Sequence, residues 1–221
     1  MRQIVSLTVS GSGVVLVRAR RGIGLPGPIA TIVGFAAVPA LAAGFKRSRL
    51  RDAAVWGIHM WAYKNAFEIP NDDHQRLRRR THFDHPRLAD ARLGGGLPPT
   101  QRIQRRLRRR GRLTGLDKAL SFFYWTWEAE PHLAMMWIRR NHPDQFAAAA
   151  GRLGATFDLT LAGYWTVPTA PPWWVSEKLG RLGEHYVTDE LAGLVLALAV
   201  DRAERPLERL AGAVLSLGSG G

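Results

Sequence analysis

The chain has 221 residues, of which 46% are hydrophobic, and a formal net charge of +13 with a pI near 11.3. Its length allows one globular domain or a bundle of about five or six membrane helices, and its charge predicts attraction to polyanions such as nucleic acid or anionic lipid headgroups. The chain has no cysteine, which excludes disulfide bonds, thiolate metal sites and a cysteine nucleophile.

Residues 1–27 are predicted to form an N-terminal segment without a clear element. Met1–Val17 is mildly apolar, but Arg18, Arg20 and Arg21 follow it. No small-residue cleavage pattern is present, so a cleaved signal peptide is not expected. We therefore expect a poorly defined start to the chain.

The first strong membrane signal is Pro28–Phe45, which carries no charge and ends at the basic run Lys46–Arg51. This pattern predicts a short membrane helix with a basic anchor, with a buried helix of a soluble protein as the alternative. The aromatic-rich block Ala53–Pro70 predicts either a second span or a helix lying in the membrane interface. If it spans, Lys46–Arg51 and Arg139–Arg140 are inside the cell and His185 is outside; if it does not, the arginine-dense region that follows is cytoplasmic.

Residues 71–115 are predicted to form a basic loop that holds at least one short helix, from Thr100 onward. The run Arg105–Arg110 would suit contacts with the phosphates of a nucleic acid. However, no stacking aromatics are interleaved with these arginines and no reader motif is present. Nucleic acid is therefore not expected as a partner. A protein that is soluble without detergent and binds RNA with a steep salt dependence would overturn this prediction.

Two further apolar blocks, Leu116–Ile138 and Phe146–Val167, contain ionisable residues. Such groups are costly at membrane depth, so they are expected to face water or the interior of the bundle. Asp158 is expected to hydrogen-bond or to pair with a basic neighbour such as Arg152 rather than to act as a catalyst.

Glu128, Glu130 and His132 lie close together in the sequence and could suggest a metal or proton site. Pro131 interrupts their helical spacing, and a metal site needs three or four convergent ligands. Neither a metal nor another cofactor is therefore expected.

These segments predict an all-α fold in which residues 28–200 form an integral membrane helical bundle of about five spans. The last span is expected at about His185–Val200, and a charged amphipathic tail, residues 201–221, closes the chain. The expected location is the cell membrane, with a multi-pass topology.

The sharpest chemical feature is Glu184–Asp189, which opens the last apolar run. Positions four apart share a helix face, so Asp189 can accept a hydrogen bond from one ring nitrogen of His185 and leave the other nitrogen free to attack or bind. The alternative is an ordinary pair of polar residues at a helix start.

Three separated segments, in the same order, match one family pattern. They are Leu97–Thr100, the loop Pro168–Trp174, and Glu184–Asp189 with Leu191–Gly193 behind it. With the stretch Asp52–Trp174, they resemble the actinobacterial membrane branch of the type 2 phosphatidic acid phosphatase superfamily. That branch is similar to fungal inositol phosphorylceramide synthases.

The resemblance implies a phosphohistidine mechanism on a lipid phosphate or phospholipid at the extracytoplasmic face. The histidine matching His185 attacks the phosphate, and the aspartate matching Asp189 orients and charges it. Arg102, Arg105 and Arg106 are the candidates for neutralising phosphoryl charge in the transition state, although none matches the first motif of the family individually.

The chain departs from the family at a second motif, Pro-Ser-Leu-His, which supplies the acid for the leaving alkoxide. Only Val175–Gly183 stands where that motif and its helices belong, so the bundle is truncated relative to the family. General acid–base help is typically worth ~100 to 10,000-fold in rate, so weak or absent turnover is expected. The alternative function is that of a non-catalytic, membrane-anchored basic protein that binds anionic lipid headgroups.

Overall fold

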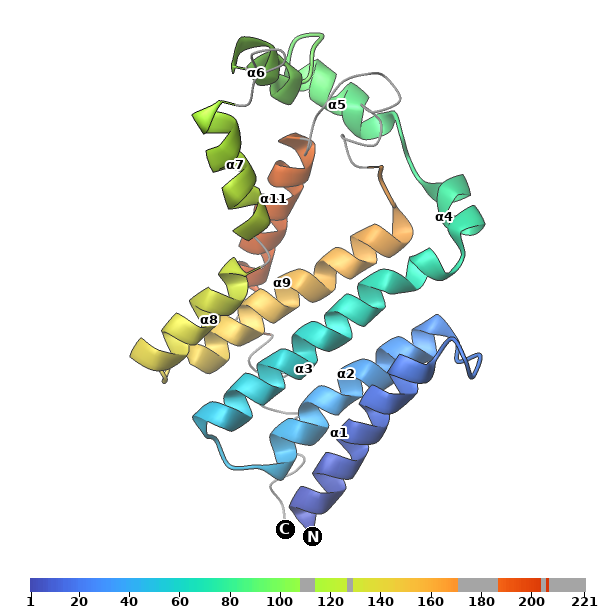
Figure 1. The fold of residues 1–221 in the computed structure, drawn as a ribbon, viewed down its shortest axis with the longest axis vertical. Coiled ribbons are helices and arrows are strands. Elements are labelled where there is room, and N and C mark those ends of the chain that lie inside the picture. The colour runs from blue at the N-terminus through green and yellow to red at the C-terminus, as the bar shows by residue number, and fades with distance from the viewer. Residues whose placement is uncertain (108–113, 127–128, 171–186, 204–205, 207–221) are drawn as a thin grey trace. The chain divides into compact units, whose positions relative to one another are not determined.

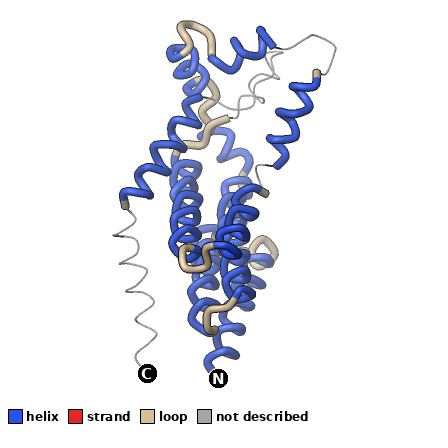
Figure 2. The backbone as a smooth tube through the Cα atoms, turned by 90° about the vertical axis from the view of Figure 1, so that its left-hand side faces the viewer, coloured by secondary structure: helices blue, strands red, loops and turns tan. Residues whose placement is uncertain are grey.

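A computed structural model gives the fold and describes residues 1–107, 114–126, 129–170, 187–203 and 206 (Figure 1). Within these residues the regular elements are helices, and the sole strand-like feature is an isolated parallel bridge between His82 and Thr169 (Figure 2). The all-α prediction is confirmed for this part of the chain.

The helices follow one another in the order of the sequence. They are α1 (Arg2–Ala19), α2 (Gly27–Gly44), α3 (Arg49–Glu68), η1 (Ile69–Asp72), α4 (His74–Arg80), α5 (His85–Leu93), α6 (Pro99–Leu107), α7 (Gly115–Thr126), α8 (Glu130–Asn141), α9 (Phe146–Thr166) and α11 (Val187–Arg202). The contacts divide the chain into two compact units. The first unit comprises Met1–His74, Met135–Ala162 and Val200–Gly221, and the second comprises Gln75–Ala134 and Gly163–Ala199.

Most predicted helices exist close to their predicted bounds. The blocks predicted from Pro28, Ala53 and Phe146 correspond to α2, α3 and α9, and the last apolar run corresponds to α11. The block Leu116–Ile138 differs, because it forms two helices, α7 and α8. Pro131 lies in the first turn of α8, where a missing amide hydrogen costs no helical bond.

Two regions contain more helix than predicted. The N-terminal segment forms the helix α1, and the basic region forms α4 and α5 before the expected short helix α6. Helix α5 ends at a glycine turn in which Gly95 and Gly96 have φ of +64° and +99°, values that favour glycine over residues with a Cβ. The described part of the basic region is therefore a series of short helices joined by turns.

In the first unit, α1, α2 and α3 pack side by side in sequence order (Figure 1). Ser48 caps α3 by accepting a hydrogen bond from the Arg51 amide at 3.1 Å, which satisfies one free donor of the first turn. Trp56 of α3 packs with Met135 of α8 and Phe146 of α9 to form the hydrophobic core. These contacts hold α8 and α9 against α3.

Within the described residues, one helix, α2, is long and apolar enough to cross a membrane. It has 18 residues and no ionisable side chain. Pro39 lies inside it, and neighbouring helices in a membrane can satisfy the carbonyl that such a proline frees.

In the second unit, the segment after α9 pairs with the turn after α4. The His82 amide donates to the Pro168 carbonyl at 2.8 Å, and the Ala170 amide donates to the His82 carbonyl at 3.0 Å. The Arg80 guanidinium also donates to the Trp165 carbonyl at 2.5 Å. The start of the proline-rich loop is thereby joined to the basic region.

Candidate functional site

A buried carboxylate organises the start of α3. The Asp52 side chain is 1% exposed, and its oxygens lie 3.1 Å from Arg51 Nη1, 2.8 Å from Arg139 Nε and 3.9 Å from Arg47 Nε. Arg51 also donates to the Ala42 carbonyl at 2.8 Å. A buried charge is tolerated only when it is paired with an opposite charge. This cluster therefore holds three elements together: the C-terminal end of α2, the start of α3, and α8.

A cavity of about 530 Å³ opens beside this cluster, between α2, α3 and α9. Most of its wall is apolar, with Val38, Val55, Trp56 and Phe146 among the contributors. Its polar wall consists of three arginines, two aspartates and one histidine, namely Arg47, Arg51, Arg152, Asp52, Asp158 and His59. Arg139 adds a further positive charge through its bond to Asp52, so arginines outnumber aspartates around the cavity.

His59 lies two helical turns beyond Asp52 on α3 and is enclosed by three helices. Its ring stacks on Trp56 at 6.0 Å between centroids and meets the edge of Phe35 from α2 at 5.7 Å. On the third side it faces Gly154 of α9, where an added Cβ would lie 2.9 Å from His59 Nε2. Glycine at 154 therefore allows α9 to approach the imidazole closely.

Asp158 lies one turn beyond Gly154 on α9 and faces the same histidine. The distance from His59 Nε2 to Asp158 Oδ1 is 3.4 Å, close enough for an ion pair but without the alignment of a hydrogen bond. The expectation of a basic neighbour is confirmed by His59. His59 lies on α3 and Asp158 lies on α9, and the spacing of these residues in the sequence does not reveal that the two helices are in contact.

Three buried polar atoms on the cavity wall have no hydrogen-bond partner among the described residues: Arg51 Nε, His59 Nε2 and Asp158 Oδ1. Leaving such an atom unsatisfied typically costs about 1–3 kcal/mol. An apolar wall with an unsatisfied guanidinium donor, Arg51 Nε, and more arginines than aspartates suits a ligand that has both an anionic group and an apolar part.

The predicted phosphate-binding arginines lie on α6, in the second unit. Arg105 and Arg106 are exposed, and Arg102 donates a hydrogen bond to the Gly94 carbonyl. That bond joins the start of α6 to the turn that follows α5, so the contact of Arg102 in the structure is with the backbone of its own unit. None of the three lines the cavity of the first unit.

The predicted catalytic pair stays a prediction. His185 lies outside the described residues, and Asp189 lies in the first turn of α11. The spacing argument requires a helix over both positions, and the described helix begins at Val187. The segment Leu97–Thr100 overlaps the start of α6. The described part of the proline-rich loop, Pro168–Ala170, forms backbone hydrogen bonds with His82.

Among the described residues, no group of three or more histidine, cysteine, aspartate or glutamate side chains is arranged to hold a metal ion. Glu130 and His132 both lie near the start of α8, and Glu128 lies outside the described residues.

A second hollow in the first unit surrounds an ion-pair cluster at the other end of α3. Asp72 accepts hydrogen bonds from Arg20 and from Arg21, whose Nε lies 2.8 Å away. Desolvation alone would raise the pKa of the Asp72 carboxyl, but the hydrogen bonds and charges of the two arginines outweigh it and hold that pKa below its ordinary value of 3.8. This cluster joins the end of α1 to η1.

Sequence reasoning missed the cavity residues His59, Asp52 and Arg51 as a site. The available signal was their spacing, because positions 51, 52, 55, 56 and 59 recur at helical intervals and place arginine, aspartate and histidine along one side of α3. Comparison with family models, with curated proteins and with solved structures returned no match.

Proposed function

We propose that this is an integral membrane protein that binds an anionic lipid phosphate in the cavity between α2, α3 and α9. In this proposal the helices form a multi-pass bundle of about five spans in the cell membrane. The observation that carries the proposal is the composition of the cavity wall, which combines an apolar surface with unsatisfied polar atoms and surplus arginines.

The arginines suit a phosphate for physical reasons. A phosphate monoester carries about −1.5 to −2 charges at neutral pH, and its oxygens accept charge-assisted hydrogen bonds from guanidinium groups. Arg51 is held in place by Asp52 and by the Ala42 carbonyl, so little side-chain entropy is lost when its Nε donor is used. The apolar wall would then accommodate the first carbons of the acyl chains.

A calorimetric titration in detergent tests this proposal. Dihexanoyl phosphatidic acid is expected to bind, dihexanoylglycerol, which lacks the phosphate, to bind at least tenfold more weakly, and inorganic phosphate to compete only at much higher concentration. The double variant Arg47→Gln/Arg152→Gln is expected to lose at least tenfold in affinity, because a hydrogen bond to a charged group is worth about 1.5–3 kcal/mol. Equal affinity for the neutral lipid would overturn the proposal.

The matched control removes the same charge outside the cavity. Arg49→Gln/Arg140→Gln changes two exposed arginines on α3 and α8 that do not line it. Its affinity is expected to stay within twofold of the parent. If both double variants weaken binding equally, the attraction is general surface electrostatics and the cavity is not the site.

A second candidate function is a lipid-phosphate phosphatase or phosphotransferase that uses His185 as nucleophile and Asp189 as its orienting group. It is supported by the resemblance of the three ordered segments to the type 2 phosphatidic acid phosphatase superfamily, with Arg102, Arg105 and Arg106 as phosphate-binding residues. The absence of the second histidine motif from the sequence predicts weak turnover.

Phosphate release from dihexanoyl phosphatidic acid tests this second candidate. Release that is lost in His185→Ala and retained in the cavity variant Arg47→Gln/Arg152→Gln would support it. Release no faster than in a protein-free blank would exclude it and leave lipid binding as the function.

A further inference from the structure

Helices α1 and α2 meet along a seam of small side chains. On α1 the buried positions are Ser6, Ser10, Gly13 and Val17, and on α2 they are Ala30, Gly34, Ala37, Leu41 and Gly44. Both sets recur at intervals of three and four residues. This is the small-residue spacing that lets two helical backbones approach closely in a membrane.

The seam also contains hydrogen bonds between the helices. Ser10 Oγ donates to the Ala37 carbonyl at 2.9 Å, and Ser6 donates to the Ala40 carbonyl. A Cβ added at Gly13 would lie 3.3 Å from the Val33 carbonyl oxygen and 3.4 Å from Ala37 Cβ. The contact is therefore close, and part of its attraction is polar rather than hydrophobic.

Several large apolar side chains of the pair point outward, whereas Val17 and Leu41 are buried. Ile4, Leu7 and Val15 on α1 are 70%, 55% and 65% exposed, and Ile32 on α2 is 69% exposed. Five of the 18 residues of α2 are buried, whereas the core helix of a soluble protein is mostly buried. In water this arrangement would expose the most hydrophobic atoms of the pair and bury the least hydrophobic ones.

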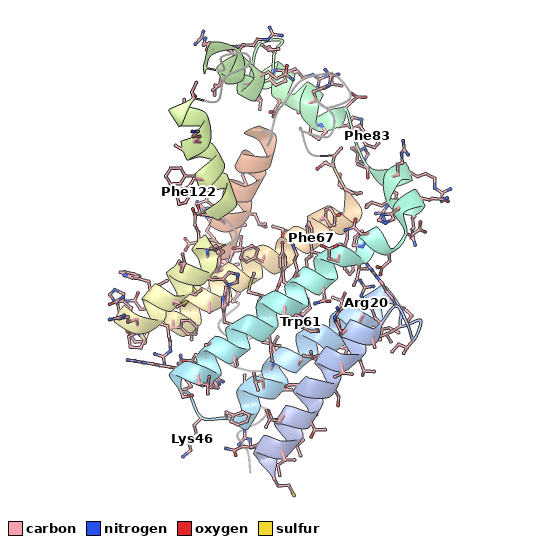
Figure 3. The ribbon with its side chains drawn as sticks, in the orientation of Figure 1. Arg20, Lys46, Trp61, Phe67, Phe83 and Phe122 are labelled. Atoms are coloured by element: carbon pink, nitrogen blue, oxygen red, sulfur yellow. The ribbon has the colours of Figure 1, made fainter. Side chains whose placement is uncertain are left out.

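Length and charge agree with a membrane environment for both helices. Each helix has 18 residues, or about 27 Å, close to the ~30 Å thickness of the hydrocarbon core. Residues 3–17 carry no charge, and Arg2 and Arg18 flank them. Figure 3 shows Arg20 and Lys46 at opposite ends of the α1–α2 pair, so cations lie at both ends of the hairpin.

From these observations we infer that α1 is a second membrane span and that α1 and α2 insert as a transmembrane hairpin, with lipid acyl chains covering their outer faces. The residues that join them, 20–26, lie on one side of the membrane, and Met1 and Lys46 lie on the other. The inverted placement of small and large side chains carries this inference, since a bilayer solvates Leu and Ile as well as a protein core does.

The absence of cysteine from the chain allows a clean accessibility test in oriented membrane vesicles. A membrane-impermeant maleimide is expected to label only one of Gly24→Cys and Lys46→Cys in sealed vesicles and both after permeabilisation. Leu7→Cys, on the outer face of α1, is expected to stay unlabelled in both conditions. Labelling of Gly24→Cys and Lys46→Cys from the same side, or labelling of Leu7→Cys as fast as Gly24→Cys, would overturn the hairpin.

A cross-linking experiment tests the seam itself. In the pair Ser10→Cys/Ala37→Cys, oxidation in membranes is expected to cross-link α1 to α2, detected as a mobility shift after cleavage of the loop at a protease site inserted at Gly24. Adding Gly13→Leu is expected to reduce the cross-link at least tenfold, whereas Gly11→Leu, where nothing lies within 4 Å of the added Cβ, is expected to leave it unchanged. Equal cross-linking in the two leucine variants would contradict the seam.

The transmembrane hairpin and the lipid-binding cavity are refuted by different experimental results. A protein that is soluble without detergent but still binds dihexanoyl phosphatidic acid would overturn the hairpin and the membrane topology, and would leave the lipid-phosphate site in place. A correctly inserted hairpin in a protein that binds no lipid phosphate would overturn the proposed function alone.

Discussion

Helix α2 meets its two neighbouring regions in opposite ways. Toward α1 it presents small residues and carbonyls that accept serine hydrogen bonds, and the helices are in close contact. Toward α3 and α9 it contributes Val38 and Ala42 to the wall of a cavity whose other side carries arginine, aspartate and histidine. The polar groups of the seam pair with each other. In the cavity wall, by contrast, three polar atoms have no hydrogen-bond partner among the described residues.

This difference separates a structural contact from a site. Where two helices satisfy each other fully, no ligand can improve the contact, because each donor already has its acceptor. Where polar atoms in a buried wall lack hydrogen-bond partners, a ligand that supplies those partners gains binding free energy from hydrogen bonds that folding did not form. Experiments that disturb each region in turn should therefore affect different properties, stability at the seam and affinity at the cavity.

The largest expected effect comes from the buried carboxylate beside the cavity. Asp52→Ala leaves Arg51 and Arg139 without their anion, and breaking a buried ion pair in this way typically costs about 3–5 kcal/mol. The free energy of unfolding, measured by circular dichroism in mixed micelles, should fall by this amount. The control Asp144→Ala, at an exposed position, should change it by less than about 0.5 kcal/mol. Similar effects of the two variants would refute the role of the cluster.

The seam should be the next most sensitive region. A Cβ added at Gly44 would overlap the Ser6 side chain, so Gly44→Ala should lower the free energy of unfolding by about 1–3 kcal/mol. Gly57→Ala, on α3, meets nothing within 4 Å and should raise it by up to about 1 kcal/mol, because alanine is the better helix former. A change of the same sign in both variants would mean that packing at the seam does not decide stability.

A smaller effect, on affinity alone, is expected from Gly154→Ala. The new Cβ would lie 2.9 Å from His59 Nε2, so the imidazole must move within the cavity. Binding of dihexanoyl phosphatidic acid should weaken by about tenfold, or about 1.4 kcal/mol, with unchanged binding in Gly163→Ala on the same helix, where nothing lies within 4 Å. Unchanged affinity in Gly154→Ala would place the ligand away from His59.

The smallest effect concerns pH and the ion pair at the far end of α3. Because the folded-state pKa of Asp72 lies below its ordinary value of 3.8, its contribution to stability is present above pH 3.8 and is lost as the pH falls through the lowered pKa. A partly exposed pair of this kind is worth about 0.2–1 kcal/mol. The melting temperature of Asp72→Asn should therefore lie slightly below that of the parent at pH 6, and the difference should shrink progressively as the pH falls below 3.8. A difference that does not shrink below pH 3.8 would contradict this account.

Much of the helical layout could be predicted from the sequence because it depends on local patterns. The charge-free run from Pro28 and the apolar block from Phe146 carry their own hydrophobic signals, and both form helices. The split between α7 and α8 was not predicted, although Pro131, which favours a first helical turn, is a local signal for it. Helix α1 was missed because serine and glycine dilute its apolar signal, although these are the residues that its partner requires.

The sequence by itself determined the all-α character, the strong positive charge, the position of the apolar span and the absence of cysteine chemistry, since each of these depends on composition or on neighbours along the chain. Only the tertiary structure decided which polar residues meet. His59 and Asp158 are far apart in the sequence and 3.4 Å apart in the fold, and Asp52 reaches Arg139 in the same way. The physical reason is that a buried charge or hydrogen bond is paired across helices, and the packing of α3 against α8 and α9 sets those pairs.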